Sequence, residues 1–509
     1  MNFKRKIAWL IGISTIARII IACCVDLGND EVYYRLYAQY LQWNYFDHPP
    51  MAGWLIRFTT FNLSADSVFF IRAGAILSAA ITSWFIFLCG KKIRDERTGF
   101  LAAFIYTTTL YGSVIAGTFI LPDSPQVAFW ALGLYLLLDV VDPTTNESVK
   151  RKKIVLFGVI AGLGMLCKIH TLFLWFGFLL FILLKKQRLF RQPGLYLAGF
   201  ITLVLFSPVI YWNIENRFIT YSFHSKRVSL HGLNADSFFS FTGGQLLYYN
   251  PVIFVLIIIS VVAAVKGKLS IKREYQLLLL LCSLPLFIIP LLISLSRHVL
   301  PHWPGPAYIG FSLLTAAYFT RPQAVITTRL IPKVLEAAMF FSVALVIAGV
   351  LLVNFYPGTF GSKKETKFGN DDFTLDMYGW NKLRDDFNAI RKRDIESGEM
   401  KPGASIICNK WFPASHIDYY IAMPLGINLI AIGDTSDIHQ YAWINAERKK
   451  IIPGDDAYCL IPSDHYFDVN TFYSHLFNSS LPADTIHQFR NGKLCRLFYI
   501  YRLKNYKNR

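Results

Sequence analysis

The residues most suited to chemistry begin in an aromatic segment near the N-terminus, NDEVYYRLYAQYLQWNYFDHPP, residues 29–50. Asp30 and Glu31 open this segment, and Asp47 and His48 close it before two prolines. A carboxylate can take a proton from a hydroxyl group, and an imidazole can exchange a proton or bind a ligand. Apolar side chains at four-residue spacing predict that the segment forms a short amphipathic helix lying at a membrane surface.

A further acid, Asp123, stands in LPDSP at the start of an apolar run. A carboxylate at a membrane boundary is costly to place, which indicates a functional role. The LPDSP sequence is also typical of the start of a helix, so the alternative is that Asp123 only caps the N-terminus of that helix.

Several cations follow on what the charge pattern predicts to be the same outer face. They are Lys168 in GMLCKIHTLF, Arg217, Lys226 and Arg227 in the next long loop, and Arg297 in SRHVLPHWPGP. Basic side chains outside the membrane go against the usual distribution and indicate an anionic ligand such as a phosphate. Snorkelling of Lys168 and contact of the loop with lipid headgroups are the alternatives.

These residues belong to a chain of 509 residues in which 54% are hydrophobic and only 17% are charged. Long uncharged runs predict a polytopic all-α membrane protein with about eleven crossings. The expected spans are 7–25, 68–90, 99–117, 123–141, 154–167, 171–184, 194–212, 246–265, 275–295, 305–320 and 334–353.

The formal net charge of +18 comes mainly from loops that alternate along the chain. The basic groups are Lys4 to Lys6, residues 91–97, 150–153, 185–191 and 266–273, and Arg321, Arg329 and Lys333. This positive-inside pattern explains the charge without a nucleic-acid partner, and it predicts a cytoplasmic N-terminus. Lys4-Arg5-Lys6 before an apolar run also resembles a signal peptide, but Arg18 within that run favours an uncleaved signal anchor.

From residue 354 onward the composition is that of a soluble domain. Buried strands are expected at 404–411, 427–433 and 457–463, helices at 379–390 and 416–423, and a hairpin turning on Asn491-Gly492. We therefore expect two domains, a transmembrane catalytic domain at 1–353 and an outer α/β domain at 354–509. No nucleotide-binding loop and no metal-spaced Cys/His cluster occurs in the sequence.

Acids and cations on one membrane face suit transfer of a group from a phosphate-linked donor. One carboxylate accepts the proton of the acceptor while the cations hold the departing phosphate. Sugars on polyprenyl phosphates are membrane-bound donors of this kind. A transporter or flippase of a lipid-linked substrate is the rival hypothesis, but ionisable residues of transporters usually lie at mid-membrane rather than at one face.

The motifs quoted above, together with GGQLLYYNP and PHWPGPAY, give residues 5–320 a resemblance to a known group. The chain resembles the bacterial branch of the dolichyl-phosphate-mannose protein mannosyltransferase family, relatives of the lipid A aminoarabinose transferase. The resemblance implies a GT-C glycosyltransferase fold with interfacial helices in the first outer loop, residues 26–66. It also implies inverting transfer of a sugar from a polyprenyl-phosphate donor. We expect a lipid or a protein as acceptor and, from the charge pattern, a site at the periplasmic face of a bacterial inner membrane.

The resemblance also implies roles for individual residues. Asp30 corresponds to the general base, Asp123 to the second-loop acid, and Lys168 to the basic residue that meets the donor phosphate. His48 replaces a lysine of the aminoarabinose transferase, so it is expected either to contact phosphate or to bind a metal. A divalent metal is one expectation, and its ligands would come from Asp47, His48, His298 and His302.

Overall fold

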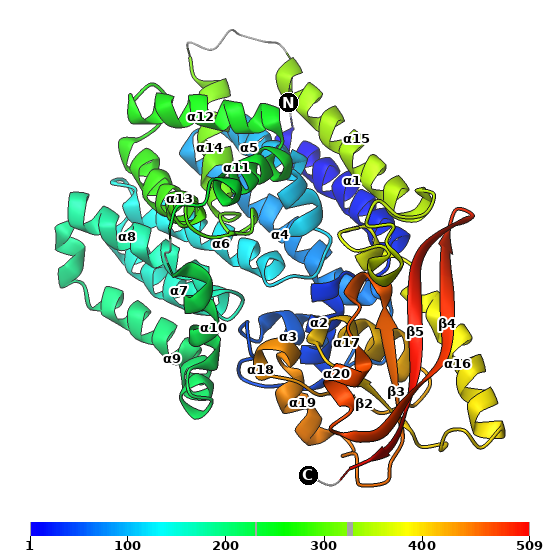
Figure 1. Cartoon of the computed structure of the whole chain (residues 1–509). Coiled ribbons are helices and arrows are strands. Elements are labelled where there is room, and N and C mark those ends of the chain that lie inside the picture. The colour runs from blue at the N-terminus through cyan, green and yellow to red at the C-terminus, as the bar shows by residue number, and fades with distance from the viewer. Residues whose placement is uncertain (1, 230–231, 323–328, 508–509) are drawn as a thin grey trace. The chain divides into compact units, whose positions relative to one another are not determined.

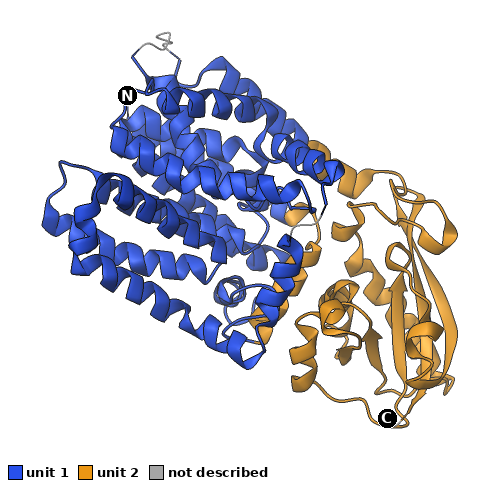
Figure 2. Cartoon of the chain, turned by 60° about the vertical axis from the view of Figure 1, so that its left-hand side comes forward, with its two compact units in different colours: residues 1–22, 41–346 blue, residues 23–40, 347–509 orange. Residues whose placement is uncertain are grey.

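The structure is a computed structural model that describes residues 2–229, 232–322 and 329–507. The chain forms two compact units (Figures 1 and 2). Unit 1 comprises residues 1–22 and 41–346, and unit 2 comprises residues 23–40 and 347–509. Unit 2 thus contains not only the expected C-terminal region but also the first half of the chemistry-bearing segment.

Unit 1 is built of helices, the first and last of which end in unit 2, and each expected span overlaps one of them or a bent pair. The long helices are α1 (Phe3–Cys24), α4 (Val68–Ile93), α6 (Asp123–Val141), α7 (Glu147–Met165), α9 (Pro193–Glu215), α13 (Arg273–Ser294) and α15 (Lys333–Phe355). The shorter ones are α3 (Met51–Thr59), α5 (Glu96–Thr108), α8 (Leu172–Lys185), α10 (Ile219–Val228), α11 (Ala235–Tyr249), α12 (Pro251–Val265) and α14 (Ala307–Thr320).

Within the described ranges, six helices are long and apolar enough to cross a membrane, or seven if the bent pair α11–α12 is one span. Helices α5, α8 and α14 have only 13 or 14 residues each. The expected number of about eleven crossings therefore stays a prediction. Helix α1 carries exposed side chains such as Trp9 and Ile13, each more than 60% exposed, which is the surface that a bilayer would cover.

The bend between α11 and α12 is fixed by Asn250. Its backbone has φ of 66°, and Pro251 follows as the first residue of α12, so the two helices meet at 100°. The Asn250 amide donates to the Ala338 carbonyl and the Ser342 hydroxyl of α15, while its oxygen accepts from the first N–H groups of α12.

Helices α4 and α5 pack closely because glycines face each other. A Cβ added at Gly99 would lie 2.2 Å from the Phe87 carbonyl oxygen, and one added at Gly90 would lie 2.5 Å from the Gly99 Cα. Small residues that let helix backbones approach are typical of packing between membrane helices.

Unit 2 contains a five-stranded mixed sheet in the order β2-β1-β3-β5-β4. Its strands are β1 (Ser405–Cys408), β2 (Leu429–Ala431), β3 (Ala457–Pro462), β4 (Phe477–Arg490) and β5 (Lys493–Tyr506). Strand β1 is parallel to both β2 and β3, whereas β5 is antiparallel to β3 and β4. The strand predictions and the hairpin are confirmed, and Asn491 and Gly492 both have positive φ as a tight hairpin turn requires.

The helices of unit 2 confirm the helix predictions as well. They are α16 (Trp380–Glu396), α17 (Trp411–Ile417), continued by a π-helical turn (Asp418–Ala422), and the shorter α18 (Thr435–Ile438), α19 (Tyr441–Glu447) and α20 (Val469–Tyr473). Helix α2 (Asn29–Gln39) also belongs to this unit and packs against α17.

Contacts along its whole length hold α2 to the rest of unit 2. The Tyr33 hydroxyl accepts from the Gln440 N–H at 3.1 Å, and its ring lies 4.9 Å from that of Trp411. Before the helix, the Leu27 N–H donates to the Tyr420 hydroxyl at 2.8 Å, and at its end Arg448 donates to the Tyr40 hydroxyl at 3.0 Å. The helix predicted for the segment 29–50 is therefore confirmed only over Asn29–Gln39, and this helix forms part of the sheet-containing unit.

The glycine contact between α4 and α5 predicts a clear difference between two substitutions. Gly99→Ala should lower the free energy of unfolding by about 1–3 kcal/mol, because the added methyl group meets backbone atoms that cannot move away. Gly12→Ala is the matched control, since nothing lies within 4 Å of the added Cβ. Thermal unfolding in detergent measures the stability of both variants. Equal unfolding midpoints for the two variants would contradict the close approach of α4 and α5.

Candidate active site

A buried ion pair stands at the start of α6. The Lys168 ammonium lies 2.8 Å from Oδ2 of Asp123, and the two side chains are 6% and 2% exposed. The Tyr111 hydroxyl donates to the other carboxylate oxygen at 3.3 Å. Asp123 is the first residue of the helix, and Pro122 is its N-cap residue without a side-chain cap. The interpretation of Asp123 as only an N-cap is therefore wrong.

The turn that carries Lys168 is fixed to α6 by a short chain of hydrogen bonds. The Gln126 amide donates to the Thr171 hydroxyl at 3.1 Å, and that hydroxyl donates to the Gly164 carbonyl at 2.8 Å. A Cβ added at Gly164 would lie 2.6 Å from the Thr171 methyl group. The motif GLGMLCKIHTL thus sets the position of Lys168 relative to Asp123.

Tyr111 is held against the loop before α14. A Cβ added at Gly305 would lie 2.0 Å from the Tyr111 ring, so only glycine allows the approach. Gln245 donates to the Pro301 carbonyl at 2.9 Å and accepts from the Tyr308 hydroxyl at 2.9 Å. The GGQLLYYNP and PHWPGPAY motifs therefore form one packed arrangement that supports the Tyr111 hydroxyl.

Histidines and one arginine surround the ion pair. His224 bonds the Asp47 carbonyl oxygen at 2.7 Å, and its ring centre lies 5.9 Å from that of His48. Arg227 lies over the Trp303 ring at 5.7 Å, and the His170 ring lies 5.9 Å from the same ring. We call the following residues of unit 1 the Asp123 cluster: His48, Asp123, Lys168, His170, His224, Arg227 and His302.

Burial and neighbouring cations keep the loop histidines neutral. Burial, with His224, Lys168 and Arg227 adding to it, lowers the pKa of His48 well below its ordinary value. Burial lowers the pKa of His302 to about 4, opposed by Asp123 and reinforced by Lys168 and Arg227. At neutral pH these imidazoles are hydrogen-bonding groups rather than cations, and the charge of the cluster comes from Asp123, Lys168 and Arg227. The cluster carries more positive than negative charge and so suits an anion.

The other expected phosphate-binding residues lie elsewhere in unit 1. Arg217 is exposed at the junction of α9 and α10, where its backbone has φ of 53°. Lys226 is exposed on α10. Arg297 donates to the carbonyl and hydroxyl oxygens of Ser229, at 2.9 and 3.3 Å, and so connects the end of α10 to the loop after α13. The phosphate role of these three side chains stays a prediction.

Asp30 and Glu31 lie in unit 2, in the first turn of α2. The Glu31 carboxylate accepts from the Gly28 N–H at 2.9 Å and closes a capping box, which gives it a structural task. Asp30 is exposed.

Asp376 was not among the residues expected from the sequence. Burial raises the pKa of its carboxyl group to about 6. A hydrogen bond with Asn29 lowers this pKa, whereas the nearby carboxylates of Asp464 and Asp30 raise it further. Only the burial of Asp376 could have indicated it, and burial is not visible in the sequence.

All four expected metal ligands lie in the described part of the chain. The described part of the chain contains no group of three or more His, Cys, Asp or Glu side chains that could hold a metal ion. His298 is exposed, while His48 and His302 belong to the Asp123 cluster. The metal set expected from Asp47, His48, His298 and His302 is thus not assembled among the described residues.

The ion pair makes a prediction for stability. Lys168→Met should lower the free energy of unfolding by about 3–5 kcal/mol, because it leaves the Asp123 carboxylate buried without its cation. The double variant Lys168→Met with Asp123→Asn should recover part of this loss, since no charge remains to be desolvated. Chemical denaturation in detergent compares the two, and a double variant no more stable than the single one would contradict the pairing.

The lowered pKa of His302 makes a prediction for pH. The pKa of His302 is lower in the folded protein than its value of about 6.5 in the unfolded chain, so between these two values the folded protein binds fewer protons than the unfolded chain. The stability of the fold therefore decreases as the pH falls from about 6.5 toward 4. His302→Gln should make the loss of thermal stability between pH 7 and pH 5 smaller than in the wild type. His298→Gln, an exposed position in the same loop, is the control and should keep the wild-type profile. Identical profiles for all three proteins would refute the assignment.

Comparisons with known proteins agree with this architecture. Residues 47–212 match the model of the family described as dolichyl-phosphate-mannose-protein mannosyltransferase. Over 292 residues, the chain is 24% identical to the lipid A galacturonosyltransferase RgtD of Rhizobium johnstonii. This match covers 57% of the chain and 60% of RgtD, so the chain spans less than two thirds of that curated relative.

Two solved structures of ArnT from Cupriavidus metallidurans share the fold. The structure bound to undecaprenyl phosphate has a TM-score of 0.66 at 12% identity and covers 97% of each chain. The apo structure has a TM-score of 0.64 at 13% identity and covers 97% of this chain and 98% of that one. The resemblance predicted from the sequence is confirmed: residues 47–212 match this family model, and the chain has the fold of ArnT, as expected for a GT-C architecture.

Proposed function

We propose that the protein is a glycosyltransferase that moves a sugar from a polyprenyl-phosphate donor to a lipid acceptor, lipid A or another envelope glycolipid. The observation that carries this proposal is the buried Asp123–Lys168 pair with Arg227 and neutral imidazoles around it. The names of the relatives support it, since RgtD is a lipid A galacturonosyltransferase and ArnT was solved with undecaprenyl phosphate.

In this proposal Lys168 binds the donor phosphate and Asp123 positions Lys168. An ammonium group has three N–H donors, and Asp123 accepts from one of them. The buried carboxylate holds the ammonium in one place, so little ordering remains to be done when the phosphate binds. Arg227 supplies the second cation, and neutral His48 donates a hydrogen bond to a phosphate oxygen without adding charge.

Transfer proceeds as an in-line displacement with inversion. The acceptor hydroxyl oxygen attacks the anomeric carbon, the bond from that carbon to the phosphate oxygen breaks, and its electron pair stays on the phosphate. The proton of the hydroxyl group goes to the general base, which we assign to Asp30 by the resemblance. The cations of the Asp123 cluster stabilise the charge that develops on the leaving phosphate.

The proposed location is the periplasmic face of a bacterial inner membrane, with the sheet-containing unit 2 on the same side. The alternating basic loops of unit 1 support this orientation, because basic side chains favour the cytoplasmic side. A donor attached to a polyprenyl chain then reaches the cluster from within the bilayer, and no nucleotide site is needed.

The assignment of Asp30 as the general base predicts that a conservative substitution at this position strongly lowers the transfer rate. Asp30→Asn should lower the transfer rate by about 10²- to 10⁴-fold, because the amide cannot accept the proton, while the protein accumulates normally. Glu31→Gln should retain most activity, since glutamine also closes a capping box. Rates of the purified proteins with a labelled donor measure both. Near-normal turnover of Asp30→Asn would remove Asp30 as the base.

The function itself is tested with undecaprenyl-phosphate sugars labelled in the sugar. Release of the labelled sugar to a lipid A acceptor, lost in Asp123→Asn, is the expected result. Movement of the intact donor across vesicles without cleavage would instead support a flippase. Mass spectrometry of envelope glycolipids and glycoproteins, with and without the gene, identifies the acceptor and distinguishes a lipid from a protein.

A further inference from the structure

Unit 2 contains a pocket at the carboxyl ends of two adjacent parallel strands, β1 and β3. After β1 the chain passes through Asn409 and Lys410 into α17 and on to β2, which lies on the outer side of β1. After β3 the chain passes through Asp464 and His465 toward the β4–β5 hairpin on the opposite side. In α/β sheets, a crevice that binds ligands forms where consecutive loops diverge in this way.

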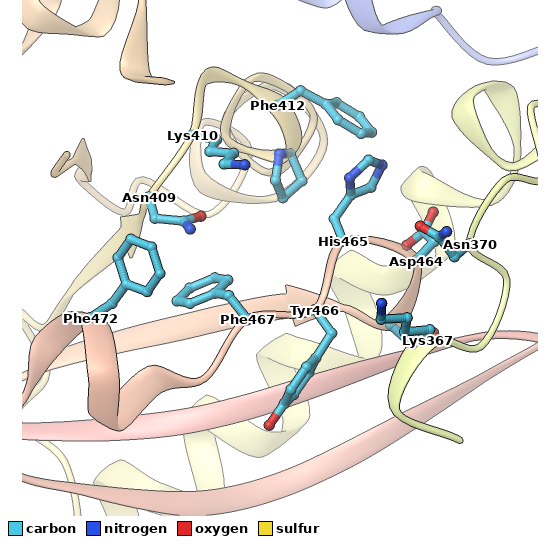
Figure 3. A pocket seen from close by; sticks show the side chains of 12 residues that line it. Lys367, Asn370, Asn409, Lys410, Phe412, Asp464, His465, Tyr466, Phe467 and Phe472 are labelled. Carbon is cyan, nitrogen blue, oxygen red and sulfur yellow. The ribbon is translucent and has the colours of Figure 1, made fainter. Parts of the chain in front are cut away.

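The pocket has a volume of about 330 Å³ and is formed by unit 2 residues alone. Figure 3 shows Asp464 and Asn370 next to each other on one side, and Phe467 and Phe472 on the other. Its lining is Lys367, Asn370, Asn409, Lys410, Phe412, Pro413, Ser463, Asp464, His465, Tyr466, Phe467 and Phe472. A volume at the lower end of the range of small-molecule sites fits a ligand of the size of one sugar residue.

Asp464 offers a buried acceptor that is not used. Its side chain is 6% exposed, and within the described residues Oδ1 has no hydrogen-bond partner. The other carboxylate oxygen, Oδ2, lies 3.6 Å from the Arg496 guanidinium. Leaving a buried carboxylate oxygen without a donor costs free energy, which indicates that a donor from outside the chain completes the site.

The remaining lining gives the chemical class of that ligand. Lys367 and Lys410 are exposed at the pocket and supply positive charge, while Asn370 and Asn409 can both donate and accept hydrogen bonds. Phe412, Phe467 and Phe472 supply apolar faces. Burial lowers the pKa of His465, Asp464 opposes this, and Arg496 and Lys410 add to it, so the imidazole is a neutral hydrogen-bonding group.

We propose that this pocket binds an anionic sugar, a monosaccharide unit that carries a phosphate or carboxylate group. Its hydroxyl groups donate to the free oxygen of Asp464 and bond the two asparagine amides, its apolar face lies on the phenylalanines, and its anionic group meets Lys367 and Lys410. The inference goes beyond sugar transfer at the Asp123 cluster, because it adds a second carbohydrate site in the other unit.

Isothermal titration of the full-length protein in detergent tests the ligand class. Glucose 6-phosphate and glucuronate are the anionic probes, and glucose and inorganic phosphate are the comparisons. We expect saturable binding of at least one anionic sugar, about tenfold or more tighter than that of either comparison. Comparing the affinities of the two anionic probes shows whether the pocket prefers a phosphate or a carboxylate group. No saturable binding of either anionic sugar, or equal binding of inorganic phosphate, would overturn the proposal.

Substitutions in and outside the pocket test whether the anionic sugar binds there. Lys410→Met and Asp464→Asn should each weaken binding about tenfold, whereas Lys450→Met, an exposed lysine of the same unit that does not line the pocket, should not change it. Asp464→Asn should fold, because Arg496 keeps its hydrogen bonds to Leu375, Tyr378 and Gln488, and thermal unfolding verifies this. Wild-type affinity in both pocket variants would overturn the proposal.

Asp123→Asn separates this proposal from the proposed function. That variant should lose sugar transfer and retain binding of the anionic sugar, because Asp123 belongs to unit 1. Loss of sugar binding in Asp123→Asn would place the ligand at the Asp123 cluster and overturn the pocket assignment.

Discussion

The arrangement of unit 1 depends on the ion pair between Asp123 and Lys168. A carboxylate and an ammonium group that are both almost completely buried must remain together, because neither can be left alone in a medium of low polarity. The pair therefore fixes the start of α6 relative to the turn that carries Lys168. Through the Tyr111 hydroxyl and its contact with Gly305, it also fixes the loop before α14.

Burial, reinforced by neighbouring cations, determines the protonation of the histidines around the ion pair. An additional proton on His48 or His302 would place a poorly solvated charge in the cluster, next to the like charges of Lys168 and Arg227. The imidazoles therefore remain neutral, and the cluster keeps a moderate positive charge rather than a large one. In the proposed function, this moderate charge serves to hold the donor phosphate and to release it after the sugar has left.

Much of this architecture could be predicted from the sequence, because local patterns determine it. The uncharged runs gave helices at the expected places, and Asn491-Gly492 marked the hairpin, since both residues tolerate the left-handed backbone of the turn. Asp123 and Lys168 were both recognised as functional candidates. Their direct pairing could not be predicted, since it depends on how the turn after α7 packs against α6.

What the sequence could not reveal depends on contacts between distant segments. Nothing in NDEVYYRL indicates that Tyr33 accepts a hydrogen bond from Gln440, so the place of α2 in unit 2 was not foreseen. The strand order and the free oxygen of Asp464 have the same origin, because each arises only when β1, β3 and the following loops are brought together. Glu31 was expected to act in catalysis, and the structure gives it a capping role.

The attachment of α2 to unit 2 has a consequence for the order in which the protein matures. Leu27 and Tyr33 bond residues that follow them by 393 and 407 positions, so the segment is synthesised long before its partners exist. Helix α2 therefore cannot form these contacts while the helices of unit 1 are being made, because its partners in the C-terminal region do not yet exist. The segment that carries the proposed base is thus among the first parts to be made, and it completes its contacts only after most of the chain has been synthesised.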